Sequence, residues 1–394
     1  MANTKLTEAK NAKNDEFYTQ YHDIEKEISA YLEYNPEVFR GKTVLLPCDD
    51  PEWSNFTKYF AQNFEKFGLK KLISTSYAVE SKTYKSDYQP TLFEIRDRQY
   101  DEFKTRKNGK IFTLTHDKTG DRKVNVDDLE WHYLAGDGDF RSTEIKKLRD
   151  EADIIITNPP FSLFREFLVW IVKADKKFLI IGNMNAITYK DFFPFLKEDK
   201  IWLGVTNFNI GMYFKVPPDF VYADSYKFER ERNGEKVNRI PGVCWFTNLD
   251  HGRRHQPLPL MTMADNFKYS KHKEIKGKDS YERYDNYDAI EVPFTDAIPS
   301  DYDGVMGVPI SFLDKYSPEQ FEIVGSDAYD ESPPTKRYSK KEKVVDGKRM
   351  KSNTGTMGCV IREENFGTGT YFDVGYPVKA LYKRIFIRNK KVTK

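Results

Sequence analysis

Short apolar runs alternate with amphipathic segments along the first two thirds of the chain. Ile24, Ile28 and Leu32 recur at helical spacing, and Ser54 and Gly68 bracket a second helical segment as its expected N-cap and stop. The apolar stretches expected to form strands are TVLL, KKLISTSY, WHYLAG, DIIIT, KKFLIIGN and KIWLGV. Strands separated by helices predict an α/β fold with a mostly parallel, doubly wound sheet.

The same pattern divides the chain into two regions. Residues 1–250 carry the alternation and are expected to form one α/β domain, with a polar, turn-rich insertion at about 79–128. Residues 251–394 consist of shorter segments rich in Tyr, Asp and Pro, which indicates a second region of different construction.

Charge is distributed unevenly along the 394 residues. The whole chain has a net charge of +2, but residues 335–394 carry sixteen Lys and Arg against five Asp and Glu, a net of +11. The first 334 residues therefore carry −9. The basic segment interleaves its cations with Tyr, Phe and Ile, which favours a surface that faces phosphates, and a solvated terminus is the alternative.

Several classes of protein are excluded by composition. No apolar stretch approaches the roughly 20 residues of a membrane helix, and the first residues contain no apolar signal core. Cys48, Cys244 and Cys359 lie far apart and the six histidines are scattered. These features predict a reduced, cytoplasmic protein with no membrane association and no metal site.

One apolar run ends abruptly at the corner Asn158-Pro159-Pro160-Phe161. Proline cannot donate a ladder hydrogen bond, and it restricts both its own φ and the residue before it. The Asn158 side-chain oxygen and the Pro159 carbonyl then form a rigid pair of acceptors that suits a planar amino group. Phe161 offers a flat apolar face to a ring.

A structural interpretation of this corner remains open. Asn158 could cap the following helix, the prolines could occupy the turn, and Phe161 could pack in the core. Two observations favour function: Asn-Pro-Pro-aromatic is rare by composition, and ligands of doubly wound sheets bind outside the carboxyl ends of the strands. The corners after Leu46, Ala135 and Thr157 are expected to share that rim.

The string TNPPF resembles the Asn/Asp-Pro-Pro-Tyr/Phe motif of amino methyltransferases that use S-adenosylmethionine. Over most of its length the chain resembles the EcoRI-type adenine-specific DNA modification methyltransferases. The resemblance is carried by DEFYTQYHDIE, CDDPEWSNFTKYFAQNFEKFGLKKLI, GDGDFRS, TNPPFSLFREFL, DKKFLII, ITYKDFF, KIWLGV, YDNYDAI and YDGVMGVPISFLDKYSPEQFE.

The resemblance implies that residues 1–250 form the catalytic domain of a site-specific DNA methyltransferase. It also implies that Asn158, Pro159, Pro160 and Phe161 form the catalytic corner. Asn158 and Pro159 would accept hydrogen bonds from the 6-amino group of an adenine. That contact makes the nitrogen nucleophilic toward the methyl group, and S-adenosylhomocysteine is the product. The adenine would be flipped out of the duplex and stacked on Phe161, with Phe214 expected on its other face. A core role for Phe214 is the alternative.

The resemblance also implies a cofactor site along the strand ends. In the family pattern an extended segment lines the methionine end, a loop follows the first strand, a Gly-Asp turn lies near the adenine end, and Asn158 borders the cofactor. These residues are Phe17, Tyr18, Thr19, Pro47, Cys48, Asp49, Asp50, Asp137, Phe140 and Asn158. The loop PCDDPEWSNF lacks the usual glycines, and Asp49 could instead be an acid at a helix N-terminus.

Residues 251–394 are expected to be the target-recognition and DNA-binding region. The candidate phosphate contacts, chosen by charge, are Arg253, Arg254, Lys268, Lys336 and Arg337. Expected partners are double-stranded DNA and a cognate restriction endonuclease, with no obligatory protein partner evident. The alternatives are an amino methyltransferase acting on RNA or protein, and a non-catalytic nucleic-acid-binding protein on a methyltransferase scaffold.

Overall fold

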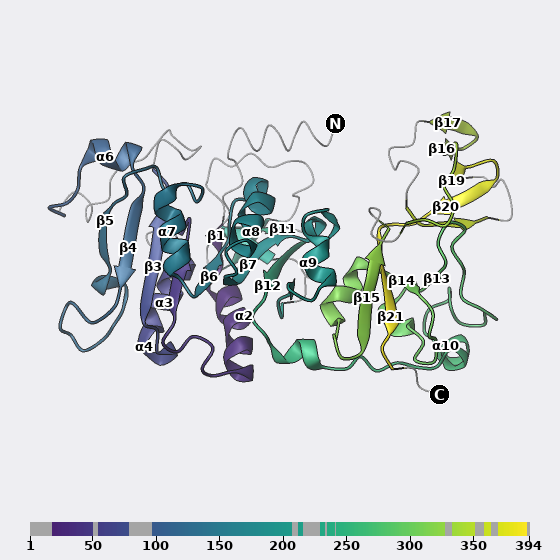
Figure 1. Cartoon of the computed structure of the whole chain (residues 1–394), viewed down its shortest axis with the longest axis horizontal. Helices are drawn as coiled ribbons and strands as arrows, with labels where there is room; N and C mark the ends of the chain where they lie inside the picture. The colour runs from purple at the N-terminus through teal and green to yellow at the C-terminus, as the bar shows by residue number, and fades with distance from the viewer. Residues whose placement is uncertain are drawn as a thin grey trace. The chain divides into compact units, whose positions relative to one another are not determined.

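The computed structural model describes residues 18–49, 54–78, 97–206, 212–215, 229–232, 235–240, 242–327, 333–350, 358–363 and 369–391. The phenylalanine at position 17 and the aspartate at position 50, both expected at the cofactor, lie outside these residues. The chain forms two compact units, Met1–Ala186 with Ile201–Gly252 and Ile187–Lys200 with Arg253–Lys394. Figure 1 shows the elements of each unit in chain order.

An eight-stranded sheet forms the core of the first unit, in the order β5-β4-β3-β2-β6-β7-β12-β8 (Figure 1). The strands are β2 (Thr43–Leu46), β3 (Lys71–Ser76), β4 (Lys110–Leu114), β5 (Glu130–Tyr133), β6 (Ile154–Thr157), β7 (Lys177–Asn183), β8 (Trp202–Leu203) and β12 (Val243–Thr247). The adjacent strands β3, β2, β6 and β7 are parallel, and the outer strands pair antiparallel. The α/β fold with its parallel central sheet is thus confirmed.

Helices cover both faces of this sheet, as a doubly wound fold requires. Val44 and Leu46 point into a core shared with α2, α3 and α4, whereas Gly182 of β7 faces Phe164 of α8 on the opposite side. The helical elements of the first unit are α2 (Tyr21–Tyr34), α3 (Asn55–Gln62), α4 (Phe64–Phe67), α6 (Glu102–Lys107), η2 (Val126–Asp128), α7 (Thr143–Glu151), η3 (Phe161–Leu163) and α8 (Phe164–Val172). A further turn, η4 (Met184–Thr188), follows β7.

The local signals for the second helical segment operate as predicted. The Ser54 side chain accepts a hydrogen bond from the Phe56 backbone at the start of α3. Gly68 ends α4 in the left-handed conformation, with φ 62°. The segment breaks into α3 and α4 at Asn63, which the sequence pattern did not indicate.

Three parts of the first unit were not predicted as sheet: strand β12, strand β4 and a second, smaller sheet. Strand β4 lies within the polar stretch expected to be an insertion, yet it pairs with β3 and β5 in the main sheet. A second sheet, in the order β1-β9-β11-β10, joins β1 (Tyr18–Thr19), β9 (Met212–Lys215), β10 (Glu229–Arg232) and β11 (Glu235–Ile240). Its strands are short and far apart in sequence, so no local alternation of apolar and polar residues predicts them.

Two further sheets form the second unit. One has the order β13-β14-β21-β15 and the other the order β17-β16-β19-β20-β18. The strands are β13 (Ile290–Glu291), β14 (Met306–Pro309), β15 (Phe321–Ser326), β16 (Glu342–Val345), β17 (Lys348–Met350), β18 (Val360–Arg362), β19 (Thr370–Asp373), β20 (Pro377–Ala380) and β21 (Arg384–Asn389). The helical elements are α9 (Phe193–Lys197), η5 (Gly252–His255, which starts at the end of the first unit), α10 (Met263–Tyr269), η6 (Thr295–Ala297) and η7 (Ile310–Lys315). Among the helices that the structure describes, none combines the length and apolar character needed to span a membrane.

Replacing Gly182 with alanine should destabilise the first unit, because a Cβ there would overlap the ring of Phe164 at the start of α8. The expected loss of unfolding free energy is about 1–3 kcal/mol, typical of overpacking in a core. Chemical denaturation measures it. Gly136→Ala is the matched control, because no atom lies within 4 Å of a Cβ at that position. Equal stability of the two variants would contradict this account of α8 packing.

Candidate active site

The carboxyl ends of the central strands meet at one rim. The Thr157 hydroxyl, at the end of β6, donates to the Pro47 carbonyl after β2 at 2.6 Å. The Ala78 amide, two residues after β3, donates to the Asp137 carbonyl at 2.8 Å. Since β4 is antiparallel to both β3 and β5, β5 points the same way as β3 and delivers its corner to this rim. The three corners therefore lie together, as expected from the sequence.

The corner 158–161 directly follows β6. Asn158 and Phe161 are half-buried and Pro159 is buried. Pro160 precedes η3 and Leu163 precedes α8, so Asn158 does not occupy the capping position of either helix. The structure therefore contradicts the interpretation of Asn158 as a helix cap.

Buried hydroxyl groups fix the loop after β2, which has no glycine. Cys48 adopts a φ of 68°, the left-handed conformation that glycine usually fills. The next residue, Asp49, is buried, and its carboxylate accepts from the Ser54 hydroxyl at 2.8 Å. Its carbonyl accepts from the hydroxyls of Thr57, at 3.1 Å, and Ser74. These hydroxyls hold the loop in a conformation that glycine would reach without strain.

Contacts from the N-terminal strand and β9 complete a ring of residues at the rim. The Asn55 side chain, at the start of α3, donates to the Thr19 carbonyl at 2.8 Å. Thr19 pairs in the sheet with Phe214. The Phe214 ring then meets the Phe161 ring edge to face, with centroids 6.3 Å apart and an interplanar angle of 87°. The ring of contacts thus passes from the loop after β2 through β1 and β9 back to the corner at residues 158–161.

Phe214 is completely buried and belongs to the core of the first unit. Its ring packs against Phe161, which favours the core role left open by the sequence; stacking of Phe214 on a base stays a prediction. Phe140 is likewise buried, and it packs against Phe167 and Trp170 at centroid distances of 5.1 and 5.6 Å. This packing role accounts for Phe140 without a cofactor contact.

A buried carboxylate anchors the chain that leads toward β9. Glu27 of α2 is fully buried and accepts from the backbone amides of Val205 and Thr206 at 2.7 and 2.8 Å. The Thr206 hydroxyl adds a third bond at 2.6 Å. Burial raises the pKa of Glu27 above its usual value, while these hydrogen bonds oppose the shift.

Sequence reasoning missed Thr57, Ser74, Asn55 and Glu27. They are ordinary polar residues on predicted helices and strands, and no motif distinguishes them. Their contacts with the loop after β2, with β1 and with the chain before β9 form only when the chain folds.

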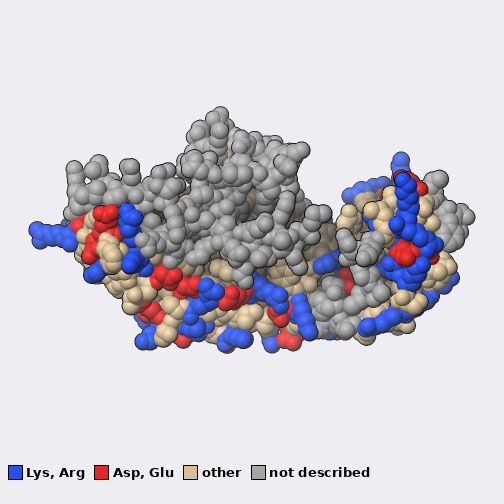
Figure 2. All heavy atoms as spheres, turned by 90° about the horizontal axis from the view of Figure 1, so that it is seen from above, with Lys and Arg blue, Asp and Glu red and all other residues tan. Residues whose placement is uncertain are grey.

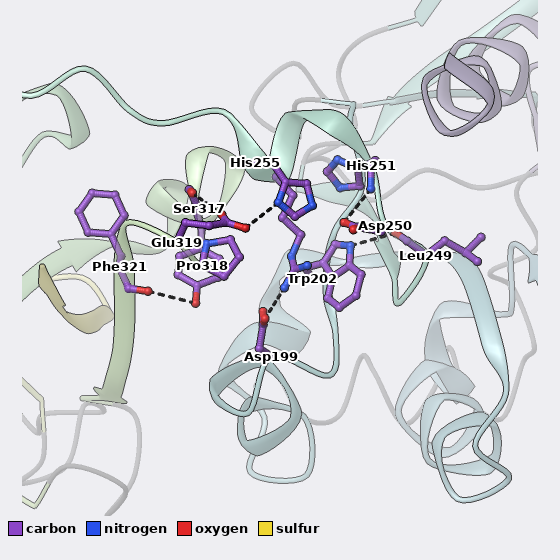
Figure 3. A network of polar contacts seen from close by, with 12 residues as sticks. Asp199, Trp202, Leu249, Asp250, His251, His255, Ser317, Pro318, Glu319 and Phe321 are labelled. Carbon is purple, nitrogen blue, oxygen red and sulfur yellow. Dashed lines mark hydrogen bonds and ion pairs between the residues drawn. The ribbon is translucent and has the colours of Figure 1, made fainter. Parts of the chain in front are cut away.

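In the second unit, three of the five candidate DNA contacts are engaged in ion pairs: Arg253, Arg254 and Lys336. Arg253 lies 2.5 Å from the buried carboxylate of Asp314, and Arg254 pairs with Asp199 and is itself buried. Figure 3 shows this region, with the His255 ring turned toward Glu319, at 2.7 Å. A fold-stabilising role accounts for both arginines, and their contact with DNA stays a prediction without structural support.

Lys336 and the other two candidates lie nearer to solvent. Lys268 and Arg337 are exposed. Lys336 joins a network around Asp285, whose carboxylate accepts from Arg362 at 2.6 Å and from the Tyr376 hydroxyl at 2.5 Å. Burial by itself would raise the pKa of Asp285, but the hydrogen bonds from Tyr338, Tyr376, Arg362 and Lys336 together hold it well below its usual value.

A parallel sheet with Asn-Pro-Pro-Phe at the end of a central strand is the arrangement of an amino methyltransferase. The family described as adenine-specific methyltransferase EcoRI matches residues 5–390. The chain is 44% identical over 322 residues, 82% of its length and 89% of the relative's, to the Type II methyltransferase M.EcoRI of Escherichia coli. It is 34% identical over 318 residues, 80% of its length and 83% of the relative's, to the Type II methyltransferase M.MpnI of Mycoplasma pneumoniae.

A third relative, the Type II methyltransferase M.MgeORF184P of Mycoplasma genitalium, is 34% identical over 317 residues, 80% of this chain and 84% of that one. No solved structure matches the chain. The chain therefore belongs to the EcoRI family of adenine-specific methyltransferases.

Relaxing the left-handed residue at position 48 should stabilise the first unit. The unfolding free energy of Cys48→Gly should be up to about 1 kcal/mol higher than that of Cys48→Ala. Alanine retains the energetic cost of the left-handed backbone conformation, and glycine does not. Both variants lack the thiol, so the comparison isolates backbone strain. Denaturant titration of the two proteins measures the difference, and a less stable glycine variant would refute the strain at this loop.

The Asp285 network should make stability depend on pH. A depressed pKa means that the charged form is stabilised in the folded protein, so the contribution is complete above the ordinary value of about 4 and is lost as pH falls below it. Asp285→Asn should therefore lose stability relative to the wild type at pH 7, and the difference should shrink toward pH 3. Asp288→Asn, at a side chain that is 88% exposed, is the control. A difference that does not vary with pH would count against the network.

Proposed function

We propose that this protein transfers a methyl group from S-adenosylmethionine to the 6-amino group of an adenine flipped out of double-stranded DNA. The observation that carries the proposal is the position of residues 158–161. They follow the central strand β6 at the carboxyl rim and are joined to the loop after β2 and to β9 by the ring of contacts described above.

The residues around the rim suit S-adenosylmethionine, which carries an ammonium group, a sulfonium and ribose hydroxyls. Asp49 offers a buried carboxylate, and Pro47, Thr19 and Asp137 lie on the elements around it. When bound, the cofactor supplies an electrophilic methyl group. No group of three or more possible metal ligands occurs among the residues that the structure describes. A mechanism without metal is our proposal.

Asn158 and Pro159 activate the adenine in this proposal. The amide oxygen of Asn158 and the carbonyl of Pro159 accept the two N–H bonds of the 6-amino group, which draws the nitrogen lone pair out of conjugation with the ring. Because two prolines follow Asn158 directly, the acceptors are held in place before the substrate arrives, and little reorganisation is needed. The methylated amine loses its proton easily, so no strong base is required.

Phe161 positions the flipped base. Its half-buried ring offers a face for stacking, and contact with the buried ring of Phe214 fixes its orientation. Flipping is required because the amino group of a paired adenine cannot reach a corner at the end of a sheet.

The second unit would grip the DNA in this proposal. Figure 2 shows Lys and Arg side chains gathered where its five-stranded sheet lies. Lys268 and Arg337 remain the candidates with exposed side chains. Each phosphate that such a side chain neutralises should make the slope of log binding constant against log salt concentration more negative by about 0.9. A cognate restriction endonuclease is proposed as the physiological partner, because the relatives are named Type II methyltransferases.

Replacing Asn158 with alanine should lower the turnover number at least about a hundredfold, because an acceptor aimed at the reacting amine is lost. DNA binding should change little. Methyl transfer from labelled S-adenosylmethionine to duplex DNA measures the first quantity, and fluorescence anisotropy with labelled duplex measures the second. Asn158→Asp keeps an acceptor and should retain more activity than the alanine variant.

The substrate is tested by offering duplex DNA, RNA and protein in parallel. Sequencing of modified adenines in DNA from expressing cells gives the methylated site. A preference for RNA or protein would overturn the proposed substrate. Unchanged turnover in Asn158→Ala would overturn the role of the corner.

A further inference from the structure

The turn at residues 381–383 joins two different sheets of the second unit, since β20 belongs to the five-stranded sheet and β21 to the four-stranded sheet. The Leu381 amide donates to the Cys359 carbonyl at 3.1 Å, which holds the start of the turn. The Tyr382 carbonyl accepts from the guanidinium of Arg384 at 3.0 Å. Both ends of the turn are therefore fixed to neighbouring structure.

Arg384 is itself firmly held. Its guanidinium donates twice to the buried carboxylate of Glu291, at 2.6 Å from Nη2 and 3.0 Å from Nε. Its backbone amide donates to the Asp327 carboxylate at 2.7 Å. The support of the turn is thus part of the core of the second unit, and little ordering would be needed when a partner binds.

This fixed turn presents an aromatic ring to solvent. Tyr382 is 91% exposed, compared with 65% for Phe103 and 59% for Tyr269, two other exposed aromatic side chains of the described residues. An exposed ring contributes little to folding, whereas the hydrogen bonds beneath it fix the backbone from which the ring projects. Such rigid presentation is expected of a residue that contacts a partner.

Lysines and a second tyrosine accompany Tyr382. The Lys383 ammonium donates to the Thr188 hydroxyl at 2.8 Å, which brings the turn to the segment that contains Tyr189 and Lys190. Tyr189 is 37% exposed, and both lysines are exposed. Because Thr188 is neutral, its bond positions Lys383 without cancelling the positive charge. We call Tyr189, Lys190, Tyr382 and Lys383 the Tyr382 patch.

We infer that the Tyr382 patch binds duplex DNA, with the Tyr382 ring stacked on a base and the two lysines on nearby phosphates. Aromatic rings between cations suit nucleic acid because every base has a π-face and every linkage a negative charge. A protein that bends a duplex partly unstacks base steps, and these are bases that an exposed ring can cover. This inference rests on the proposed function and adds to it a contact outside the catalytic corner.

The test compares Tyr382→Ala, Tyr382→Phe and the wild type in anisotropy titrations with a duplex that contains the methylated site, at several salt concentrations. Tyr382→Ala should bind about tenfold or more weakly, the usual effect of losing one base–aromatic stack. Tyr382→Phe should bind like the wild type because it keeps the ring. The slope of log affinity against log salt should not change, since a stacked ring neutralises no phosphate.

Phe103→Ala is the matched control, because Phe103 is an exposed aromatic with its own lysine, Lys107, 4.4 Å from the ring centre. It should bind DNA normally.

Three results would overturn the inference: affinity of Tyr382→Ala within twofold of the wild type, equal losses in Tyr382→Phe and Tyr382→Ala, or equal losses in Phe103→Ala. The first would direct the search to a protein partner for the patch. Failure of the proposed function itself is distinguishable, because a wild-type protein that does not methylate DNA fails before any variant is compared. The side chain is almost fully exposed, so unfolding midpoints of the variants should match the wild type and confirm that they fold.

Discussion

The hydrogen bond from the Thr157 hydroxyl to the Pro47 carbonyl joins the ends of two neighbouring parallel strands just before each chain leaves the sheet. Parallel pairing already sets β2 beside β6, but it says nothing about the loops beyond. The bond fixes the end of β6 relative to the end of β2 at the rim. Pro159 and Pro160 then restrict the backbone at the next two positions. The sheet therefore fixes the positions of Asn158 and Pro159, because no flexible segment lies between them and β6.

The loop after β2 is also held in one conformation, but by side-chain hydroxyl groups and not by prolines. Where related methyltransferases are expected to use glycine, this chain places Cys48 in the left-handed region and surrounds the following carbonyl with the hydroxyls of Thr57 and Ser74. Buried hydroxyls that satisfy a carbonyl stabilise one conformation of the loop, and the rest of the fold supports the local strain. The loop thereby depends on side chains from α3 and β3 as well as on its own residues.

Local patterns in the sequence were enough to predict the central strands, the capping of α3 by Ser54 and the corner at 158–161. Each of these follows from residues that are adjacent or one helical turn apart. Strand β4 and the sheet containing β9 were beyond such reasoning, because their pairing joins short segments separated by long stretches of chain. The ion pairs of Arg253 and Arg254 were equally hidden, since charge alone does not distinguish a cation that meets a phosphate from one that meets Asp314 or Asp199.

The pairing of Thr19 with Phe214 has a consequence for biosynthesis. One strand of that pair leaves the ribosome early and the other much later, so the early strand must wait while the sheet between them forms. Domains can begin to fold during synthesis, but a ring that needs its first and last members cannot close before the later one emerges. The contacts that link Thr19, Phe214 and Phe161 therefore cannot form until β9 has been made.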